Sequence, residues 1–328
     1  MSPSPSPSPS PASSGEEDPE PGLAEAAAVR ALSRSFSTEV TPRAARALPR
    51  FDTLLPHGTA VYVPHLPGLD YEAVVPPLCA RLKAEGMVPV PHVAVRAVPS
   101  RAALDRWLAA LVDRGGVDRL LLLAGAAERP AGPFASTLPV LDEGILLRHG
   151  LTTLGVAGHP EGHPQAPAED LARALKAKQD YAAETGSTLW ITTQFTFSAT
   201  PVVGWLRAIR AAGITLPVRV GLPGPASPRT LLRYALSCGI GASLTVLRRR
   251  PGAAAGLLGT WTPETMIRDI AAAAVAEPES APEGLHAFPF GGVETTAHWF
   301  RTLAGTPAEE EAQSVSRARR GRETRTGS

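Results

Sequence analysis

The sequence predicts an α/β fold, a single-domain (β/α)8 TIM barrel. Eight short segments rich in β-branched and other apolar residues alternate with longer segments whose apolar residues recur at helical spacing. Such alternation is typical of parallel sheets, because each helix returns the chain to the edge where the next strand begins. The expected strands are residues 33–40, 60–64, 88–95, 119–124, 152–157, 189–194, 218–222 and 285–290.

Capping signals mark the helices between these strands. Ser100 can cap the start of one helix, which Gly115 and Gly116 end. Four more glycines stand just past other helical segments, namely Gly86, Gly150, Gly186 and Gly213. The expected helices are residues 71–84, 101–114, 138–148, 170–185, 202–212 and 228–238.

Eight parallel strands also fit an open, doubly wound sheet. That fold places a glycine-rich phosphate loop after its first strand, whereas residues 39–43 (EVTPR) contain no glycine. The closed barrel is therefore the better prediction. Residues 239–276 exceed one helix and carry a second helical pattern at 263–276, which predicts an inserted helix or subdomain between the last two strands.

The two ends of the chain differ from the part between them. Residues 1–28 begin with alternating Ser and Pro and then become acidic, so they are expected to form a disordered leader. Residues 306–328 are polar and carry both charge signs, which predicts a disordered, solvated tail. The barrel domain is assigned to residues 29–305.

Composition excludes several classes of protein. With 44% apolar and 19% charged residues the chain can bury a globular core, and a net charge of +1 provides no field that attracts nucleic acid. No apolar run reaches the ~20 residues of a membrane span, and the N-terminus has no apolar signal core. Cys79 and Cys238 are too far apart in sequence for a metal or redox motif, so a cytoplasmic protein without membrane or nucleic-acid partners is expected.

In a barrel the carboxyl ends of the strands converge on one mouth, so unusual polar residues there are functional candidates. Glu39 ends the first expected strand and becomes a general acid if burial raises its pKa toward neutrality. The alternative is a structural carboxylate paired with Arg43. His92, in the third strand, is either a satisfied core histidine or a ligand contact at the rim.

The segment after the fifth strand contains His159, Glu161 and His163, whose side chains are possible zinc ligands. Two prolines interrupt the segment, and a His pair at this spacing binds one metal chiefly when a helix aligns it. No metal site is therefore expected, and ligand contacts or loop structure are the better interpretations.

The sixth strand ends in Gln194 and Phe195. The Gln194 amide offers a donor and an acceptor for the edge of a heterocycle, and the rings of Phe195 and Phe197 either contact a ligand or pack in the core. A helical lysine such as Lys178 either lies on a solvated face or meets a phosphate.

Seven short segments carry a resemblance to a known family. They are residues 36–43 (FSTEVTPR), 90–94 (VPHVA), 122–125 (LLAG), 132–136 (GPFAS), 156–164 (VAGHPEGHP), 175–178 (LKAK) and 191–197 (ITTQFTF). In this order they resemble the methylenetetrahydrofolate reductase family across about residues 33–300. The loop at 156–164 and the strand at 191–197 are the most specific matches.

The resemblance implies a TIM barrel that binds FAD at its rim, takes hydride from NADH or NADPH, and reduces 5,10-methylenetetrahydrofolate to 5-methyltetrahydrofolate. It implies that Glu39 is the acid that opens the imidazolidine ring to an iminium and that Gln194 holds the pterin, with Phe195 beside it. Family members often associate into homo-oligomers, although the sequence gives no interface signal. The residues that match flavin-contact positions are His92, Gly125, Ala135, His159, His163, Asp170 and Lys178.

The chain departs from the family where a flavin is expected. Ala124 and Ala126 replace an Arg and an Asp, His159 replaces a tyrosine, Ser198 replaces an Asp, and residues 288–292 (FPFGG) provide no Arg. Loss of the Asp is expected to alter flavin potential or folate affinity. The alternatives are therefore a flavin-free enzyme, an enzyme of the oxidative direction, and a barrel that binds folate or flavin without catalysis.

Overall fold

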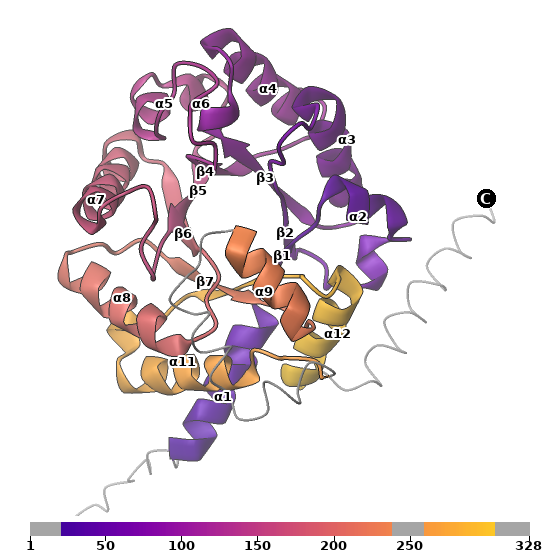
Figure 1. Cartoon of the computed structure of the whole chain (residues 1–328), viewed down its shortest axis with the longest axis vertical. Coiled ribbons are helices and arrows are strands. Elements are labelled where there is room, and N and C mark those ends of the chain that lie inside the picture. The colour runs from indigo at the N-terminus through magenta and orange to yellow at the C-terminus, as the bar shows by residue number, and fades with distance from the viewer. Residues whose placement is uncertain (1–20, 238–258, 306–328) are drawn as a thin grey trace, which may run out of the picture.

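The fold is a closed barrel of eight parallel strands, each paired with its neighbours in chain order (Figure 1). This computed structural model describes residues 21–237 and 259–305. The predicted fold class is thereby confirmed. The strands are β1 (Ser37–Glu39), β2 (Ala60–Val63), β3 (Val88–Ala94), β4 (Arg119–Leu123), β5 (Thr153–Gly158), β6 (Thr188–Thr193), β7 (Val218–Pro223) and β8 (Gly284–Phe288).

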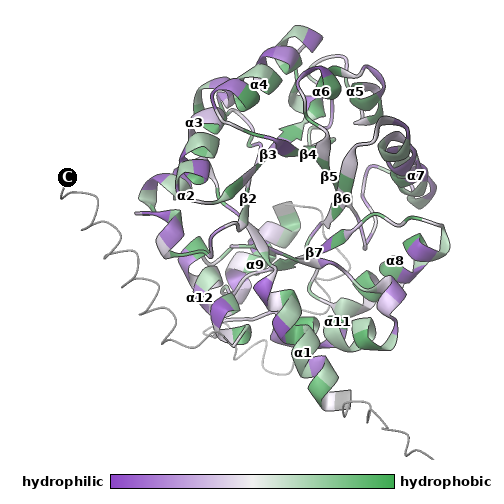
Figure 2. Ribbon diagram, turned by 180° about the vertical axis from the view of Figure 1, so that it is seen from behind, coloured by the Kyte–Doolittle hydropathy of each residue, from purple (hydrophilic) through white to green (hydrophobic). Residues whose placement is uncertain are grey.

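Helices surround the barrel and pack on the outward side chains of the strands. Figure 2 shows their hydrophobic residues concentrated on the sides that face the sheet. The helices are α1 (Pro21–Arg34), α2 (Pro42–Ala47), α3 (Tyr71–Ala84), α4 (Arg101–Asp113), α5 (Leu138–Asp142), α6 (Ile145–Arg148), α7 (Ala168–Thr185), α8 (Ala199–Ala211), α9 (Pro228–Ser237), α11 (Glu264–Ala276) and α12 (Val293–Leu303).

The expected boundary between leader and barrel is wrong. Helix α1 begins at Pro21, inside the segment 1–28 that was assigned to the leader, and it continues into the expected first strand. Val29 and Leu32 are buried where α1 packs against α11 and α12, so burial of one helical face orders this segment. Only the part from Ser37 onward is left for β1.

Two other expectations are changed by the structure. The helix expected at 138–148 is divided into α5 and α6 by Gly144, whose φ of 64° lies in the left-handed region. The second helical pattern of the long connection forms α11, between α8 and α1. The expected tails before residue 21 and after residue 305, together with residues 238–258 of this connection, lie outside the described residues.

The inside of the barrel is packed with alternate strand residues. Tyr62, Val90 and Leu121 form a buried cluster there, beside the indole of Trp190. Two strand glycines stand where a larger side chain would not fit, and the first of them is next to this cluster. A Cβ at Gly155 would lie 2.7 Å from the Trp190 ring, and a Cβ at Gly221 would lie 2.3 Å from the carbonyl oxygen of Thr193.

Helix α9 does not take a place in the outer ring. It follows β7 and lies across the face of the barrel in Figure 1, while α11 occupies the outer position between α8 and α1. Leu231 and Ala235 of α9 are buried against Phe195, Phe197 and neighbouring aromatic residues. Among the helices that the structure describes, none has both the length and the apolar character needed to cross a membrane.

We expect Gly221→Ala to destabilise the protein, because its methyl group would meet the Thr193 carbonyl oxygen at 2.3 Å and backbone atoms move little. A loss of about 2 kcal/mol in the free energy of unfolding is expected, measured by urea denaturation. Gly204→Ala is the matched control, since its Cβ would meet nothing within 4 Å in the interior of α8. That change should stabilise by about 0.5–1 kcal/mol, and equal effects of the two substitutions would contradict the packing described.

Candidate functional site

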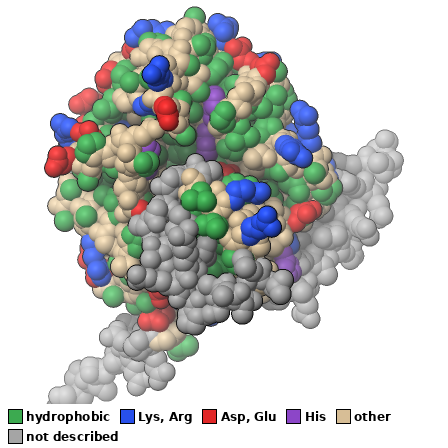
Figure 3. Space-filling model, viewed as in Figure 1, with side chains coloured by type: hydrophobic (Ala, Val, Ile, Leu, Met, Phe, Trp, Pro, Cys, Tyr) green, Lys and Arg blue, Asp and Glu red, His purple; other side chains and the backbone are tan. Residues whose placement is uncertain are grey.

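The carboxyl ends of the strands surround a hollow on the face that α9 crosses. Figure 3 shows histidine side chains inside this hollow. Strand alternation explains which residues face it, because positions two apart share one side of the sheet. Glu39 is in register with the inward-facing Tyr62, and His92 and Gln194 are an even number of residues beyond the inward-facing Val90 and Trp190.

Glu39 is half-buried at the end of β1. Burial raises the pKa of its carboxyl from 4.5 to about 7, because protein atoms replace the water that would solvate the charge. Arg43 is exposed and forms no ion pair with Glu39, so the structural pairing that the sequence left open is not formed. At neutral pH the carboxyl is therefore protonated in a large fraction of the protein molecules, and it can donate this proton.

A hydrogen-bonded network lies inside the barrel below Glu39. The hydroxyl of Tyr62 is 3.0 Å from Thr192 Oγ1 and accepts a hydrogen bond of 2.9 Å from Trp190 Nε1. On the other side, His286 Nδ1 lies 3.0 Å from the hydroxyl of Ser37. The Tyr62 and His286 rings are in contact, with centroids 4.3 Å apart. These side chains satisfy one another's hydrogen-bonding groups and form the floor of the hollow.

His92 lies beside this floor with one unpaired nitrogen. Its ring meets the Tyr62 ring edge-on at 5.8 Å, and its backbone carbonyl accepts a hydrogen bond of 2.8 Å from the Tyr71 hydroxyl. Nε2 is buried and has no hydrogen-bond partner in the described structure. Burial, together with nearby His65, lowers the pKa of His92 to about 3, so the imidazole is neutral. Depending on the tautomer, Nε2 can donate one hydrogen bond to a ligand or accept one from it.

Lys178 is a buried cation on α7, only 7% exposed. No acidic side chain in the described ranges forms an ion pair with it, and burial lowers its pKa to about 8. Burial, with His163 and Lys178 nearby, lowers the pKa of His159 to about 4. The rings of His159 and His163 meet edge-on at 5.0 Å. This part of the hollow therefore combines neutral imidazoles with one unpaired ammonium, which suits an anionic or carbonyl-rich ligand group.

Gln194 and Phe195 have different surroundings. The half-buried Gln194 side chain accepts a hydrogen bond of 3.0 Å from the Phe195 amide through Oε1, which leaves its NH2 group for a ligand. Phe195 is 1% exposed and packs against Phe288 and Phe290 at 5.2 and 4.8 Å. The Phe195 ring therefore supports these two half-buried rings from below instead of facing the hollow.

Three further candidates from the sequence have surroundings of other kinds. Gly125 follows β4 with φ 91°, and a Cβ there would lie 3.0 Å from Ala94. Ala135 is exposed and offers its carbonyl to Arg96 at 3.4 Å. Asp170 is exposed on α7, where its carboxylate forms an ion pair with Arg173. His92, His159, His163 and Lys178 thus form the candidate ligand set, whereas Ala135 and Asp170 face solvent.

Three residues of the site were missed by the sequence patterns. Tyr62 and His286 form the floor, and half-buried Phe288 ends β8 in register with Pro223 of β7. A polar or aromatic residue at an inward position of an apolar strand was the available signal. No three His, Cys, Asp or Glu side chains gather as metal ligands within the described part of the chain.

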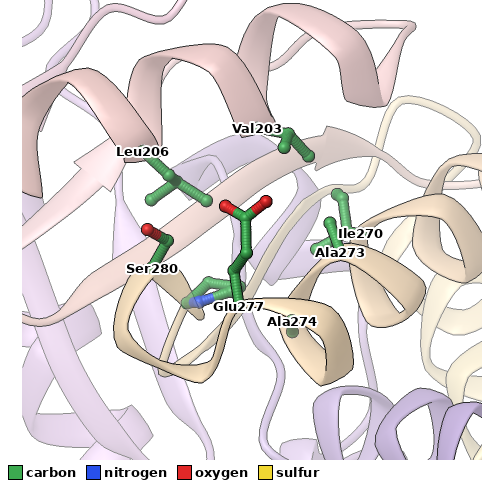
Figure 4. A pocket seen from close by; sticks show the side chains of 8 residues that line it. Val203, Leu206, Ile270, Ala273, Ala274, Glu277 and Ser280 are labelled. Carbon is green, nitrogen blue, oxygen red and sulfur yellow. The ribbon is translucent and has the colours of Figure 1, made fainter.

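A second depression, between α8 and α11, is distant from this chemistry. Figure 4 shows it lined by Val203, Leu206, Ile270 and Glu277. It encloses only about 10 Å³, which is far less than the roughly 300–1,000 Å³ of typical ligand pockets. Glu277 is engaged there by Arg207. The candidate site therefore stays at the mouth of the barrel, where the buried polar groups without partners in the described ranges are.

No family model matches the chain, and the solved structures that resemble it share its fold. An uncharacterized protein from Clostridium thermocellum, described as binding two copies of 5-methyl-5,6,7,8-tetrahydrofolic acid, aligns with a TM-score of 0.54 and 10% identity over 85% of this chain and 98% of that one. At this identity the similarity shows the fold. The apo form of a protein assigned as a deoxyribose-phosphate aldolase from Toxoplasma gondii aligns with a TM-score of 0.41 and 12% identity over 85% and 99% of the two chains.

We expect Lys178→Met to stabilise the ligand-free protein. Unfolded, Lys178 has its ordinary pKa of 10.5, whereas in the folded protein it releases its proton at about 8. The penalty of burying the cation is therefore complete below pH 8 and disappears as pH rises to about 10.5. At pH 7 the substitution should add about 3 kcal/mol to the free energy of unfolding, and this gain should shrink at pH 10.

Urea denaturation at the two pH values measures this effect. Lys176→Met is the control, because Lys176 is an exposed residue of the same helix, paired with Asp180. It should change stability by less than about 0.5 kcal/mol at either pH. A destabilised Lys178→Met protein at pH 7 would contradict the unpaired, buried state of Lys178.

Proposed function

We propose that the chain binds a reduced folate in the mouth of the barrel and acts on its one-carbon unit, with Glu39 as proton donor. The observation that carries the proposal is the carboxyl of Glu39, which is half-buried at a strand end, has a pKa of about 7 and forms no ion pair within residues 21–237 and 259–305. A binding protein without catalysis has no need of such an acid. A general acid is most effective when its pKa lies near the working pH.

Two independent similarities support folate as the ligand. The motifs at residues 36–43, 156–164 and 191–197 resemble those of the methylenetetrahydrofolate reductase family. The Clostridium thermocellum barrel with the same fold is described as binding a methylated tetrahydrofolate. The Gln194 amide and the unpaired His92 Nε2 also suit the edge of a pterin, which presents ring nitrogens, an amino group and a carbonyl.

The proposed step is a proton transfer followed by hydride reduction. Glu39 donates its proton to the imidazolidine nitrogen of 5,10-methylenetetrahydrofolate that leaves the one-carbon unit, and the ring opens to an iminium. The carboxylate that remains stabilises the iminium cation in a site of low solvent access. Hydride from NADH or NADPH then gives 5-methyltetrahydrofolate.

FAD, the cofactor that the family resemblance implies, fits these residues in part. His92 and Lys178 offer contacts to a flavin ring, but Ala124 and Ala126 supply neither the Arg nor the Asp of the family. Ala135 and Asp170, at two other matched positions, face solvent. The donor set thus does not fit a tightly held FAD, and we propose a flavin-free folate site.

Glu39→Gln should separate binding from chemistry. Glutamine keeps the size of the side chain but cannot donate the proton, so oxidation of NADH or NADPH with methylenetetrahydrofolate should fall by roughly a hundredfold or more. The dissociation constant of 5-methyltetrahydrofolate, measured by calorimetry, should change little. The wild-type rate should fall as pH rises through about 7, because Glu39 then loses its proton.

Glu264→Gln is the control for this variant, since Glu264 pairs with Arg268 on α11. It should leave both turnover and folate binding unchanged. Near-normal turnover of the Glu39→Gln protein would remove Glu39 from the acid role. Absence of folate binding by the wild-type protein would refute the proposed ligand.

The flavin-free proposal is tested on the purified protein. Its visible spectrum should show no flavin band, and added FAD should not raise the rate of methylenetetrahydrofolate reduction with either nicotinamide cofactor. Lys178 and His92 would then be available to the other ligands of the hollow. A stoichiometric flavin band, or turnover that depends on added FAD, would contradict this proposal.

A further inference from the structure

Two cations flank the paired imidazoles of the mouth. Burial and the charge of nearby Arg96 lower the pKa of His163. Burial lowers the pKa of His159 as well, with contributions from His163 and Lys178. Because the two imidazole rings are in contact, with centroids 5.0 Å apart, the four side chains form one continuous row. No acidic side chain within residues 21–237 and 259–305 forms an ion pair with either cation, so the row is positive at both ends.

Arg96 is fixed at the rim, in the short 3-10 helix that follows β3. Its amide donates a hydrogen bond of 3.0 Å to the Ala124 carbonyl, and its own carbonyl accepts one of 2.8 Å from the Ala131 amide. Its guanidinium donates to the backbone carbonyls of Glu128 and Ala135, while Nε is buried without a hydrogen-bond partner among the described residues. All of these partners are uncharged groups, so they hold the guanidinium in place without neutralising it.

The loop that Arg96 holds is the one where the sequence departs from the family it resembles. Ala124 stands where the family has an Arg, and the carbonyl of Ala124 is the partner of the Arg96 amide. A guanidinium from the end of β3 is therefore next to the position at which the loop after β4 supplies none.

Lys178 and His163 offer donors to the same ligand. Lys178 is 7% exposed, and a buried ammonium without a counter-ion gains much when an anion binds beside it. His163 is neutral at pH 7, and its Nδ1 accepts a hydrogen bond of 3.2 Å from the Gln165 amide. The proton of this ring is therefore on Nε2, which is a donor. The row thus offers two cations and an imidazole N–H, and these groups suit an anion with several oxygen atoms.

We propose that Arg96 and Lys178 bind the diphosphate of NADH or NADPH. This inference rests on the proposed function, because that function brings one of these hydride donors to the mouth that contains Glu39. A diphosphate carries a negative charge on each phosphate, so it matches two cations separated by imidazoles better than a single carboxylate does. The loop after β1 (residues 39–43) has no glycine-rich sequence that could bind phosphate through backbone amides. The cationic side chains of the row therefore supply the phosphate contacts.

Calorimetry of NADH and NADPH binding to the folate-free protein tests the proposal. Arg96→Gln and Lys178→Met should each weaken the binding of the preferred cofactor by roughly tenfold or more. Arg96→Lys keeps the charge but loses the bidentate geometry, so it should weaken binding less than Arg96→Gln does. Inorganic pyrophosphate should compete with the cofactor in the wild-type protein and compete poorly in the Lys178→Met protein. The affinity for 5-methyltetrahydrofolate should be unchanged in all three variants.

Lys176→Met is the control, because Lys176 is exposed on the same helix and pairs with Asp180. It should keep the wild-type affinity for both cofactors. The Lys178→Met protein keeps the test decisive if Arg96→Gln loosens the loop after β4, because Lys178 makes no contact that holds this loop in the described structure.

The outcomes separate this proposal from the proposed function. Wild-type cofactor affinity in the Arg96→Gln and Lys178→Met proteins, or no binding of either cofactor by the wild type, would overturn the diphosphate site. Weaker binding of 5-methyltetrahydrofolate with unchanged cofactor binding would assign the cations to the folate carboxylates and also overturn it. A wild-type protein that binds the cofactor through these residues but binds no folate would support the diphosphate site and refute the proposed function.

Discussion

The hydroxyl of Tyr62 crosses the barrel from β2 to the opposite strand β6, where it meets Thr192 and the Trp190 indole. In a closed barrel of eight strands these two strands are diametrically placed, so this contact joins opposite walls and closes the interior. Small residues make it possible, since side chains at Gly155 or Gly221 would occupy the space of Trp190 and of the β6 backbone. Glu39 lies at the end of β1 next to this packed interior, and its burial raises the pKa of its carboxyl to about 7.

The strand positions could be read from the sequence because parallel strands and amphipathic helices leave strong periodic patterns. The predicted boundary between the leader and the barrel was nevertheless wrong. The residues of α1 follow a Pro-rich, acidic stretch, and their order depends on contacts with α11 and α12, which are distant in sequence. Local composition cannot reveal such a partner. The same limit explains Gly144, whose left-handed conformation divides a helix that periodicity alone predicts as continuous.

The positions of the candidate residues were predictable where strand ends carry polar residues, and less so where side-chain surroundings depend on neighbouring elements. Glu39, His92 and Gln194 follow from alternation alone. The surroundings of Phe195 depend on α9, whose location across the mouth no periodic pattern encodes, because an amphipathic helix can cover either the outside of the barrel or its end. Asp170 is a comparable case, since its ion pair with Arg173 is a local helix contact and directs it to solvent. Motif position therefore predicts which strand end a residue occupies, but not whether its side chain reaches a ligand.

The charges of the mouth are arranged in layers, and this arrangement constrains its ligand. His92 and His159 are neutral at pH 7 because burial keeps their pKa values near 3 and 4. Of the titratable groups discussed in the hollow, Glu39 and Lys178 are the ones that carry or exchange charge near neutral pH. The arginines of α9, by contrast, are exposed and permanently charged. The two layers therefore differ in what they accept: an anion outside meets exposed charges at little desolvation cost, whereas an anionic or carbonyl group inside the hollow must meet the Lys178 ammonium, because the imidazoles beside it are uncharged.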